Sequence, residues 1–507
     1  MSHIVIQDAL YNAKSVRQLD RLAIQQLAIP SIVLMKRAAR AAFNELLDAW
    51  GKPSLITVFC GSGNNAGDGY IVSALAAEKG IVTRVIELAS VEKLSADAAL
   101  AREYSAKSGV SFEAFHSGID LYEGVIVDAL LGIGFQPSVD NPMREQYVKA
   151  IHSINSAALP ILSIDLPSGL CSDTGSAADS AVKADISVTF IAAKQGMFSG
   201  RGPALCGEII YHSLNIDEEL FHQQPCSSEL MNLDDLLEHY PERDADAYKN
   251  QFGHTMVIGG DRGYGGAGLM AAESALRTGA GLVSVATRPE HVAAILARQP
   301  EIMASGIISG QELEPLLDKP TVLIVGPGLG RSPWSEQLLQ KAVATGLPMV
   351  MDADALNIIA EGRVVPNPDG SRWVMTPHPA EAARLLNVSV EEVQADRFTA
   401  VRKLQEKFNA VVLLKGAGTL IASADNDRIM VCPYGNPSMA TAGMGDMLSG
   451  IIGGLLAQGL ELSQAAQLGC CLHSAAADMA VEKQGSRCLV ATDITSPLTA
   501  LLNGADL

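Results

Sequence analysis

Glycine-rich turns that also carry polar residues are the part of this sequence best suited to chemistry. The first of them, GSGNNAGDGY (61–70), directly follows the apolar run LITVFC (55–60). Backbone amides in a turn between a strand and a helix bind phosphate groups. This turn also carries Asn64 and Asn65, whose side-chain oxygens suit a hard cation or a hydroxyl better than a phosphate. We therefore expect a loop that combines amide donors with oxygen ligands.

The same stretch fits the G-x-G-x-x-A pattern of dinucleotide-binding folds through Gly61, Gly63 and Ala66. Glu87, at the end of the next apolar run, has the spacing of the carboxylate that binds the ribose in such folds. Asp68 disfavours this interpretation, because we expect it in the first turn of the helix, where a carboxylate competes with pyrophosphate for the positive end of the helix dipole. A dehydrogenase and an ordinary tight turn are the two alternatives.

Two further aspartates follow strand-like runs in the first half of the chain. They are Asp128 in VDALLGIGFQPS (127–138) and Asp165 in SIDLPSGL (163–170). The carboxyl ends of parallel strands meet at one edge of a sheet, where ligands bind. A single aspartate at such a point is often a cap or turn residue. Three polar strand ends at the same edge predict a binding site.

The second half has its own glycine-rich turn in GNPSMATAGMGDMLSGIIGGLLAQG (435–459). Gly443, Gly445 and Asp446 immediately precede a helical pattern, and bare amides at a helix start bind anions. A carboxylate there costs electrostatic energy, so we interpret Asp446 as a base that takes a proton from a hydroxyl attacking phosphorus. The alternative is an aspartate that caps its own helix.

Other strand ends in the second half add candidate contacts. Lys415 and its neighbouring glycines follow a strand in VLLKGAGTLI (412–421), and His378 precedes a proline-started helix in TPHPAEAARLL (376–386). The stretch VIGGDRGYGGAG (257–268) contains another G-x-G-x-x-G, which by itself does not specify a dinucleotide. The sequence contains no G-x-x-x-x-G-K-[ST], so a P-loop enzyme is excluded.

These residues must be positioned by two series of short apolar runs that alternate with helical stretches, which predicts α/β domains with parallel sheets. A helical pattern over 12–50 precedes the first series. A polar, acidic and Pro-broken segment at about 215–250 separates it from the second series. We expect one domain at 1–220 and another at 221–507.

The overall composition excludes some function classes. The chain has 507 residues, 48% hydrophobic and 18% charged, with a net charge of −19. This charge repels nucleic acid and anionic membranes, and we expect neither as a partner. The eight cysteines form no C-x-x-C pair, as is typical of a reducing compartment. No signal-peptide pattern and no apolar run of bilayer length occur, so we expect a cytoplasmic protein.

In the first half, GSGNNAGDG, VDALLGIGF and SIDLPSG together resemble the NAD(P)H-hydrate epimerase domain, over about residues 10–215. The resemblance implies a Rossmann-like three-layer sandwich and a potassium ion held by Asn65, Asp128 and Ser168. Asp165 is the candidate acid or base of the epimerisation, through either an iminium or ring opening. The implied contacts with hydrated nucleotide are Asn64, Asn65, Ala66, Gly67, Asp68, Gly132, Ile133, Gly134, Phe135, Gln136, Pro137, Ser138 and Asp165.

In the second half, GPGLG, DADAL, HPAE, KGAGT and AGMGD resemble the ribokinase-like fold and, within it, the NAD(P)H-hydrate dehydratase, over about residues 226–505. The resemblance implies ADP as co-substrate, contacted by Lys415, Gly416, Ala417, Gly418, Thr419 and Gly445. It implies hydrated nucleotide contacted by Gly268, Gly328, His378 and Asp446.

The expected function is repair of NADH and NADPH to which water has been added. The first domain would interconvert the R and S epimers, and the second would dehydrate the S epimer with ADP, giving NAD(P)H, AMP and phosphate. Magnesium and the glycine amides would stabilise charge on the transferring group. We expect hydrated NADH and hydrated NADPH (NADHX and NADPHX) as the small-molecule substrates. We also expect the protein to form a homo-oligomer. The alternatives are a kinase of a vitamin-like alcohol with a regulatory N-terminal domain, and a binding module without activity.

Overall fold

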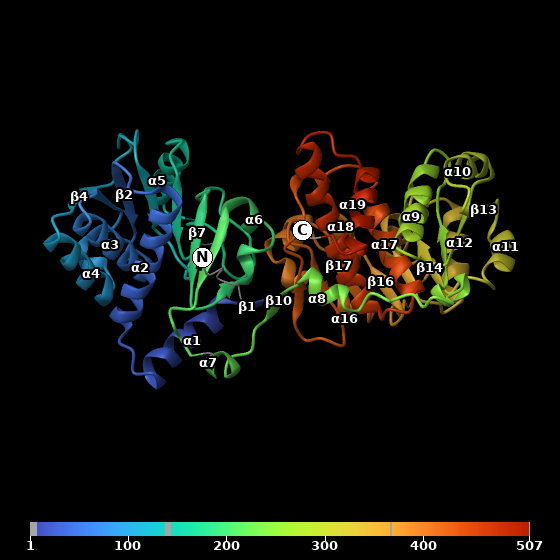
Figure 1. Cartoon of the computed structure of the whole chain (residues 1–507), viewed down its shortest axis with the longest axis horizontal. Helices are drawn as coiled ribbons and strands as arrows, with labels where there is room; N and C mark the ends of the chain where they lie inside the picture. The colour runs from blue at the N-terminus through green and yellow to red at the C-terminus, as the bar shows by residue number, and fades with distance from the viewer. Residues whose placement is uncertain (1–7, 137–142, 218, 366–367, 506–507) are drawn as a thin grey trace. The chain divides into compact units, whose positions relative to one another are not determined.

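The computed structural model describes residues 8–136, 143–217, 219–365 and 368–505. It forms two compact units, Met1–Glu229 and Leu230–Leu507. Each unit is an α/β structure built on a largely parallel sheet, as predicted (Figure 1).

The sheet of the first unit has the strand order β4-β3-β2-β5-β6-β7-β9, and every neighbouring pair is parallel. Its strands are β2 (Leu55–Cys60), β3 (Val82–Glu87), β4 (Ser111–Ala114), β5 (Val125–Ala129), β6 (Ile161–Ile164), β7 (Ile186–Phe190) and β9 (Glu208–His212). The chain order reverses between β2 and β5, and the crevice beyond such a reversal is the usual ligand position in open α/β sheets. The turn GSGNNAGDGY follows β2 and therefore lies there.

Helices cover both faces of this sheet, which makes the predicted three layers. They are α1 (Ala13–Gln26), α2 (Ser31–Trp50), α3 (Asn64–Glu78), α4 (Ala96–Lys107) and α5 (Glu145–Ser156). Along β2, Val58 shares a core with α2 and α3, whereas Phe59 shares one with α5. This alternation is what a strand buried on both faces requires. The shorter elements of this unit are β1 (Ala9–Tyr11), β8 (Ala193–Lys194), α6 (Gly202–Leu205), α7 (Glu219–His222) and β10 (Ser228–Leu230), which spans the division between the units.

In the second unit the strands follow the order β13-β12-β11-β14-β15-β16-β17-β18-β19. They are β11 (His254–Ile258), β12 (Leu282–Thr287), β13 (Met303–Gly306), β14 (Val322–Val325), β15 (Met349–Met351), β16 (Trp373–Met375), β17 (Val411–Leu414), β18 (Leu420–Ala422) and β19 (Ile429–Val431). Pairs as far as β17 are parallel, and β17, β18 and β19 pair antiparallel. The run at 412–421 is therefore a hairpin, and residues 415–419 form its loop.

The helices of the second unit pack on both sides of this sheet (Figure 1). They are α8 (Leu233–Leu237), α9 (Gly265–Arg277), α10 (Val292–Arg298), α11 (Gly310–Leu313), α12 (Pro333–Ala344), α13 (Ala353–Glu361), α14 (Pro379–Leu386), α15 (Val390–Ala395), α16 (Arg397–Phe408), α17 (Met444–Ala457), α18 (Leu462–Gln484) and α19 (Thr495–Leu502).

The glycines inside α17 serve helix packing. A Cβ at Gly450 would lie 1.9 Å from Ser274 Oγ and 2.1 Å from Ala271 O of α9. Absence of that atom lets the two helices approach closely and fixes the position of the α17 N-terminus. Glycines inside α17 such as Gly450 thus serve packing against α9. Only the glycines at the start of the helix, Gly443 and Gly445, are available to a ligand.

We expect Gly450→Ala to destabilise the second unit, because the added methyl group meets backbone as well as the Ser274 side chain. Overpacking of this kind costs about 1–3 kcal/mol. The measurement is the midpoint of its thermal unfolding transition. Gly266→Ala in α9 is the matched control, since no atom lies within 4 Å of its added Cβ. Equal midpoints for the two variants would contradict the packing role of Gly450.

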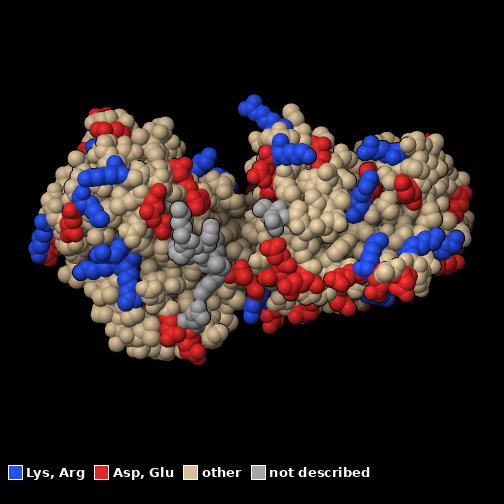
Figure 2. Space-filling model, viewed as in Figure 1, with Lys and Arg blue, Asp and Glu red and all other residues tan. Residues whose placement is uncertain are grey.

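Acidic side chains gather along the lower edge of the second unit in Figure 2, where the chain around α8 runs in Figure 1. Lys and Arg are scattered over the same face (Figure 2). None of the described helices combines the length and the apolar character needed to cross a bilayer.

Candidate active sites

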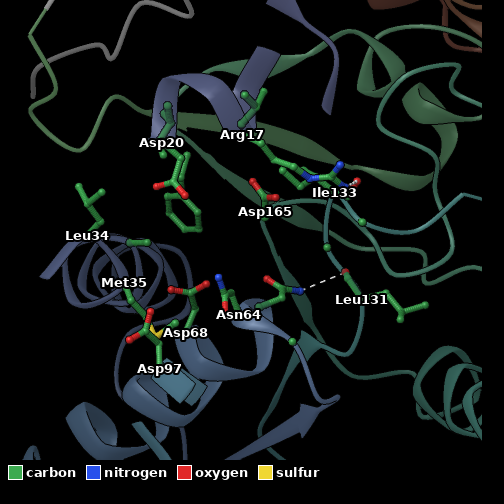
Figure 3. A pocket seen from close by; sticks show the side chains of 18 of the residues that line it. Arg17, Asp20, Leu34, Met35, Asn64, Asp68, Asp97, Leu131, Ile133 and Asp165 are labelled. Carbon is green, nitrogen blue, oxygen red and sulfur yellow. Dashed lines mark hydrogen bonds between the residues drawn. The ribbon is translucent and has the colours of Figure 1, made fainter. Parts of the chain in front are cut away.

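The first unit contains a pocket of about 600 Å³ at the reversal of its strand order. Its walls come from α1, α2, the start of α3, and the loops that follow β5 and β6 (Figure 3). A Cβ at Gly61 would lie 2.1 Å from Leu130 O, so this glycine allows the turns after β2 and β5 to meet. The polar strand ends predicted to share one edge are thus brought together.

The structure changes two expectations about this turn. The helix α3 begins at Asn64 with Gly63 as its N-cap, which places Asp68 beyond the first turn. The prediction that the Asp68 carboxylate competes with a pyrophosphate at the helix start is therefore wrong. Glu87 does end β3, but its carboxylate is bound by Arg102 Nε at 2.7 Å and by the Tyr70 hydroxyl at 2.7 Å. It is held within the protein and does not line the pocket.

The residues expected to contact hydrated nucleotide fall into three groups. Those that line the pocket are Asn64, Asn65, Asp68, Gly132, Ile133, Gly134, Phe135 and Asp165. Ala66 and Gly67 are buried in α3, and a Cβ at Gly67 would meet the Met35 side chain at 2.5 Å, so these two serve packing. Gln136 is exposed and outside the lining, and Pro137 and Ser138 lie outside the described residues.

Asp165 follows β6 directly and has a left-handed backbone conformation, with φ of +69°. Its carboxylate pairs with the ammonium of Lys194, whose side chain is only 1% exposed. Lys194 lies within the run ISVTFIAAKQGM, and we did not single it out from the sequence. A lysine inside an otherwise apolar run was the available signal, since buried lysines need a partner.

Three more carboxylates belong to this part of the pocket. Burial, followed by the charges of Asp165 and Asp20, raises the pKa of Asp68 well above its usual range. Burial and the neighbouring Asp97 likewise raise the pKa of Asp20. The pocket therefore has an acidic end. Arg17, which donates to Ile133 O at 3.2 Å, adds a positive charge beside the glycine loop.

Asp128 and Ser168 lie beneath the pocket, fully buried and bonded to each other. Ser168 donates to Asp128 through its hydroxyl at 2.6 Å and through its backbone amide at 2.8 Å. Asn65 Nδ2 donates to Leu131 O at 3.1 Å, and Leu131 N donates to Ser168 Oγ at 2.8 Å. Asn65 Oδ1 is buried without a hydrogen-bond partner in the described part of the chain. The three residues expected to share a cation are thus connected through Leu131.

In the second unit, Asp446 lies in the first turn of α17, whose N-cap is Gly443 with φ of 91°. Gly443, and not Asp446, is thus the N-cap of α17, so the alternative of an N-cap aspartate is wrong. Burial and the charge of Asp352 raise the pKa of Asp446 to about 7, although Lys415 opposes them.

Lys415 and Asp352 form an ion pair beside Asp446. Lys415 Nζ donates to Asp352 Oδ1 at 2.7 Å, and Ser449 Oγ donates to Asp352 Oδ2 at 2.9 Å. Burial lowers the pKa of Lys415, but the charges of Asp352, Glu381 and Asp446 and the hydrogen bond to Asp352 together outweigh it, so the net direction is upward. A Cβ at Gly445 would lie 3.3 Å from Lys415 Nζ, which places the start of α17 against this pair.

The hairpin loop after β17 is open to solvent at Gly416 and Ala417, and Thr419 Oγ1 closes it by donating to Gly416 O at 3.0 Å. From below, the buried guanidinium of Arg397 donates to Leu414 O at 3.2 Å. The residues expected to contact ADP thus form one supported loop next to Gly445.

His378 caps α14, where its Nδ1 accepts from Ala380 N at 3.1 Å. Burial and Lys415 lower its pKa, so the ring is neutral at physiological pH. Glu381 of the same turn is 4% exposed, and burial raises its pKa to about 7. Gly268 and Gly328 both lie against the loop after β11, since a Cβ at Gly328 would lie 2.7 Å from Tyr264 O and one at Gly268 would lie 3.8 Å from Gly260 N.

Comparison with known proteins assigns both units. The family described as NAD(P)H-hydrate dehydratase matches residues 255–499, and the family described as YjeF-related protein N-terminus matches residues 31–196. A bifunctional NAD(P)H-hydrate repair enzyme of Coxiella burnetii is 46% identical over 97% of this chain and 99% of its own length. The chain belongs to the family of bifunctional NAD(P)H-hydrate repair enzymes.

Solved structures match the second unit of this family member. A ribokinase-like superfamily protein of Enterococcus faecalis is 30% identical, covers 55% of this chain and 96% of its own, and has a TM-score of 0.50. An ADP/ATP-dependent NAD(P)H-hydrate dehydratase of Bacillus subtilis, co-crystallised with ATP and magnesium, is 26% identical, covers 54% of this chain and 96% of its own, and has a TM-score of 0.48. The match to the Enterococcus faecalis protein confirms the ribokinase-like fold expected for the second half.

Proposed function

We propose that this repair-enzyme family member restores hydrated NADH and NADPH in two steps, one in each unit. The first unit interconverts the R and S epimers, and the second dehydrates the S epimer with ADP to give NAD(P)H, AMP and phosphate. The observation that carries this proposal is the match to bifunctional repair enzymes over 97% of the chain. Each unit also holds a partly buried lysine–aspartate pair, which includes Asp165 in the first unit and lies beside Asp446 in the second.

In the second unit, Asp446 takes the proton of the ring hydroxyl, and the hydroxyl oxygen attacks the β-phosphorus of ADP. The bond from that phosphorus to the oxygen of AMP breaks, and the electron pair leaves with AMP. Phosphate is a better leaving group than hydroxide, so the ring nitrogen then expels it. Loss of a proton from the adjacent ring carbon restores the double bond. Lys415, the hairpin loop and the Gly445 amide bind the phosphates.

The surroundings of Asp446 suit a magnesium ion that is carried by the nucleotide. No group of three or more His, Cys, Asp or Glu side chains suited to a metal occurs among the described residues. Magnesium often has only one or two protein carboxylates together with substrate phosphates and water. Here the ADP phosphates and water would supply the ligands, so that Asp446 stays free to act as the base. A bound magnesium ion would neutralise charge on the transferring phosphoryl group.

In the first unit, Asp165 transfers a proton to or from the hydroxyl on the ring carbon next to the nitrogen, and the pocket holds the nucleotide. The unpartnered, buried Asn65 Oδ1 fits a potassium ion, which binds neutral oxygens. Asn65, Ser168 and Asp128 would hold it. The ion would fix the loop after β5 against α3 and so keep the pocket in shape.

The kinase alternative is not favoured, because the relatives that span nearly the whole chain are repair enzymes. NADHX and NADPHX as substrates, cytoplasmic location and self-association belong to the same proposal. Light scattering measures the last of them directly.

Incubation with pure R epimer, ADP and magnesium tests the proposal. We expect the absorbance of reduced nicotinamide to return, which requires both units to act in sequence. Recovery from S but not from R would contradict the epimerase assignment. Appearance of a stable phosphorylated alcohol would support the kinase instead.

Dehydration is expected to depend on pH through Asp446. The base must be ionised to accept a proton, and its pKa is about 7. We therefore expect kcat/KM for the S epimer to rise with pH through about 7 and to fall about tenfold per unit below it. Glu381 titrates in the same range. If the Glu381→Gln variant keeps the acidic limb of the pH profile, that limb belongs to Asp446. If the variant loses the limb, the assignment to Asp446 is wrong.

A further inference from the structure

The carboxylates that line the pocket of the first unit have unequal surroundings. Asp165 pairs with the ammonium of Lys194, whereas Asp68 has the carboxylates of Asp165 and Asp20 as its principal charged neighbours. Figure 3 shows Asp68 on α3 and Asp165 on the loop after β6, both in the wall of the same pocket. Two carboxyl groups in such different environments are suited to opposite roles in proton transfer.

Lys194 fixes Asp165 as an anion. Its Nζ donates to Thr189 Oγ1 at 2.8 Å and to Phe190 O at 2.9 Å, and the third donor of the ammonium goes to Asp165. A charged group that is 1% exposed requires a counter-charge, and Asp165 is its ion-pair partner. The carboxylate is therefore ionised and held in one position at the pocket wall.

Asp68 has the opposite environment. It lines the pocket half-buried and accepts no hydrogen bond from the described part of the chain. Burial and the negative charges of Asp165 and Asp20 raise its pKa well above the usual range. A carboxyl group in this environment holds its proton to a higher pH than an exposed aspartate does and can deliver it to a bound molecule.

We propose that Asp68 is the proton donor of epimerisation, that Asp165 is the proton acceptor, and that Lys194 is a positioning residue. This inference rests on the epimerase function proposed above. Asp68 gives its proton to the ring hydroxyl, and the C–O bond breaks with its electron pair on the oxygen, so water leaves. The lone pair of the ring nitrogen forms the C=N bond of an iminium. The anion of Asp165 stabilises this cation.

Addition of water from the opposite face completes the exchange. The water oxygen bonds to the ring carbon, the C=N electrons return to nitrogen, and Asp165 takes a proton from the added water. Asp68 is then ionised and Asp165 protonated, which is the form that acts on the other epimer. Proton exchange with water in the pocket restores the starting form. Ring opening would instead keep the original oxygen on carbon.

The wild-type chain in H₂¹⁸O, supplied with pure R epimer of hydrated NADH and no ADP, tests this sequence. Without ADP the second unit does not consume the product, and the S epimer is isolated for mass spectrometry. We expect one solvent ¹⁸O in each molecule of S that the protein forms. Retention of the original oxygen would overturn the inference while leaving the epimerase function intact. Formation of S at only the protein-free rate would contradict the epimerase function itself.

Variants then assign the roles. We expect Asp68→Asn to lower epimerisation by a factor of about 10²–10⁴, the range for loss of a general acid. Asp179→Asn, an exposed aspartate of the same unit, is the matched control. Equal rates in the two variants would overturn the role of Asp68.

For Lys194→Met we expect a lower kcat of epimerisation with little change in KM, because Asp165 loses the ammonium that holds it in position at the pocket wall. Asp20, Asp68, Asp97 and Arg17, the other charged groups of the pocket, are unchanged in this variant. A purely structural role would lower the unfolding temperature and leave the kcat of the folded protein in place. We expect Lys194→Arg to restore kcat in part.

Discussion

Asp446→Asn is expected to lower the rate of dehydration by a factor of about 10²–10⁴, the usual contribution of a general base. The amide is nearly isosteric with the carboxyl group but cannot take a proton from the ring hydroxyl. Burial and neighbouring charges, with no hydrogen bond among the causes, set the pKa of this carboxylate, so the substitution breaks no hydrogen bond in the described part of the α17 turn. Formation of NADH from pure S epimer with ADP measures the effect.

Epimerisation of the R epimer by the same variant serves as an internal control, because the first unit is unchanged. Asp318→Asn, an exposed aspartate of the second unit, controls for the chemical change itself. If Asp446→Asn and Asp318→Asn dehydrate the S epimer at the same rate, Asp446 is not the base.

Asp165→Asn is expected to lower epimerisation by a similar factor of about 10²–10⁴ and to leave dehydration of the S epimer unchanged. The variant loses the anion that accepts the proton and stabilises the cationic ring. It also leaves the buried ammonium of Lys194 without a counter-charge, which costs about 3–5 kcal/mol when a buried pair is broken. The rate of conversion of pure R to S, without ADP, is the measurement.

The double variant Asp165→Asn/Lys194→Met separates chemistry from stability. Removal of both charges is expected to restore the unfolding temperature towards the wild-type value, because no unpaired charge is buried. Epimerisation is expected to stay slow. Recovery of epimerisation together with stability would show that Asp165 acts only as a structural partner.

The sequence predicted the parts of the fold that have a regular pattern. Continuous apolar runs such as LITVFC became buried parallel strands, and the helical pattern at 12–50 became α1 and α2. The glycine-rich stretches also marked the turns at which α3 and α17 begin. The hairpin after β17 was not foreseen, because an apolar run interrupted by KGAGT does not reveal that its second part turns back to pair antiparallel.

The charged partners inside the sites were harder to predict. Lys194 and Asp165 are 29 residues apart, and Asp352 and Lys415 are 63 apart, so only folding brings each pair together. Sequence spacing also placed Asp68 in the first turn of its helix, whereas the helix begins early enough to turn this side chain into the pocket. A residue's role in these sites depends on neighbours that local sequence does not contain.

The fate of the ring oxygen tests the central claim most directly. The S epimer, labelled with ¹⁸O at the ring hydroxyl, is dehydrated with ADP by the Asp165→Asn chain, in which exchange at that carbon is suppressed. If the hydroxyl attacks phosphorus, the released inorganic phosphate carries one ¹⁸O atom and the solvent carries none. Unlabelled phosphate with the label in water would contradict phosphoryl transfer to the hydroxyl.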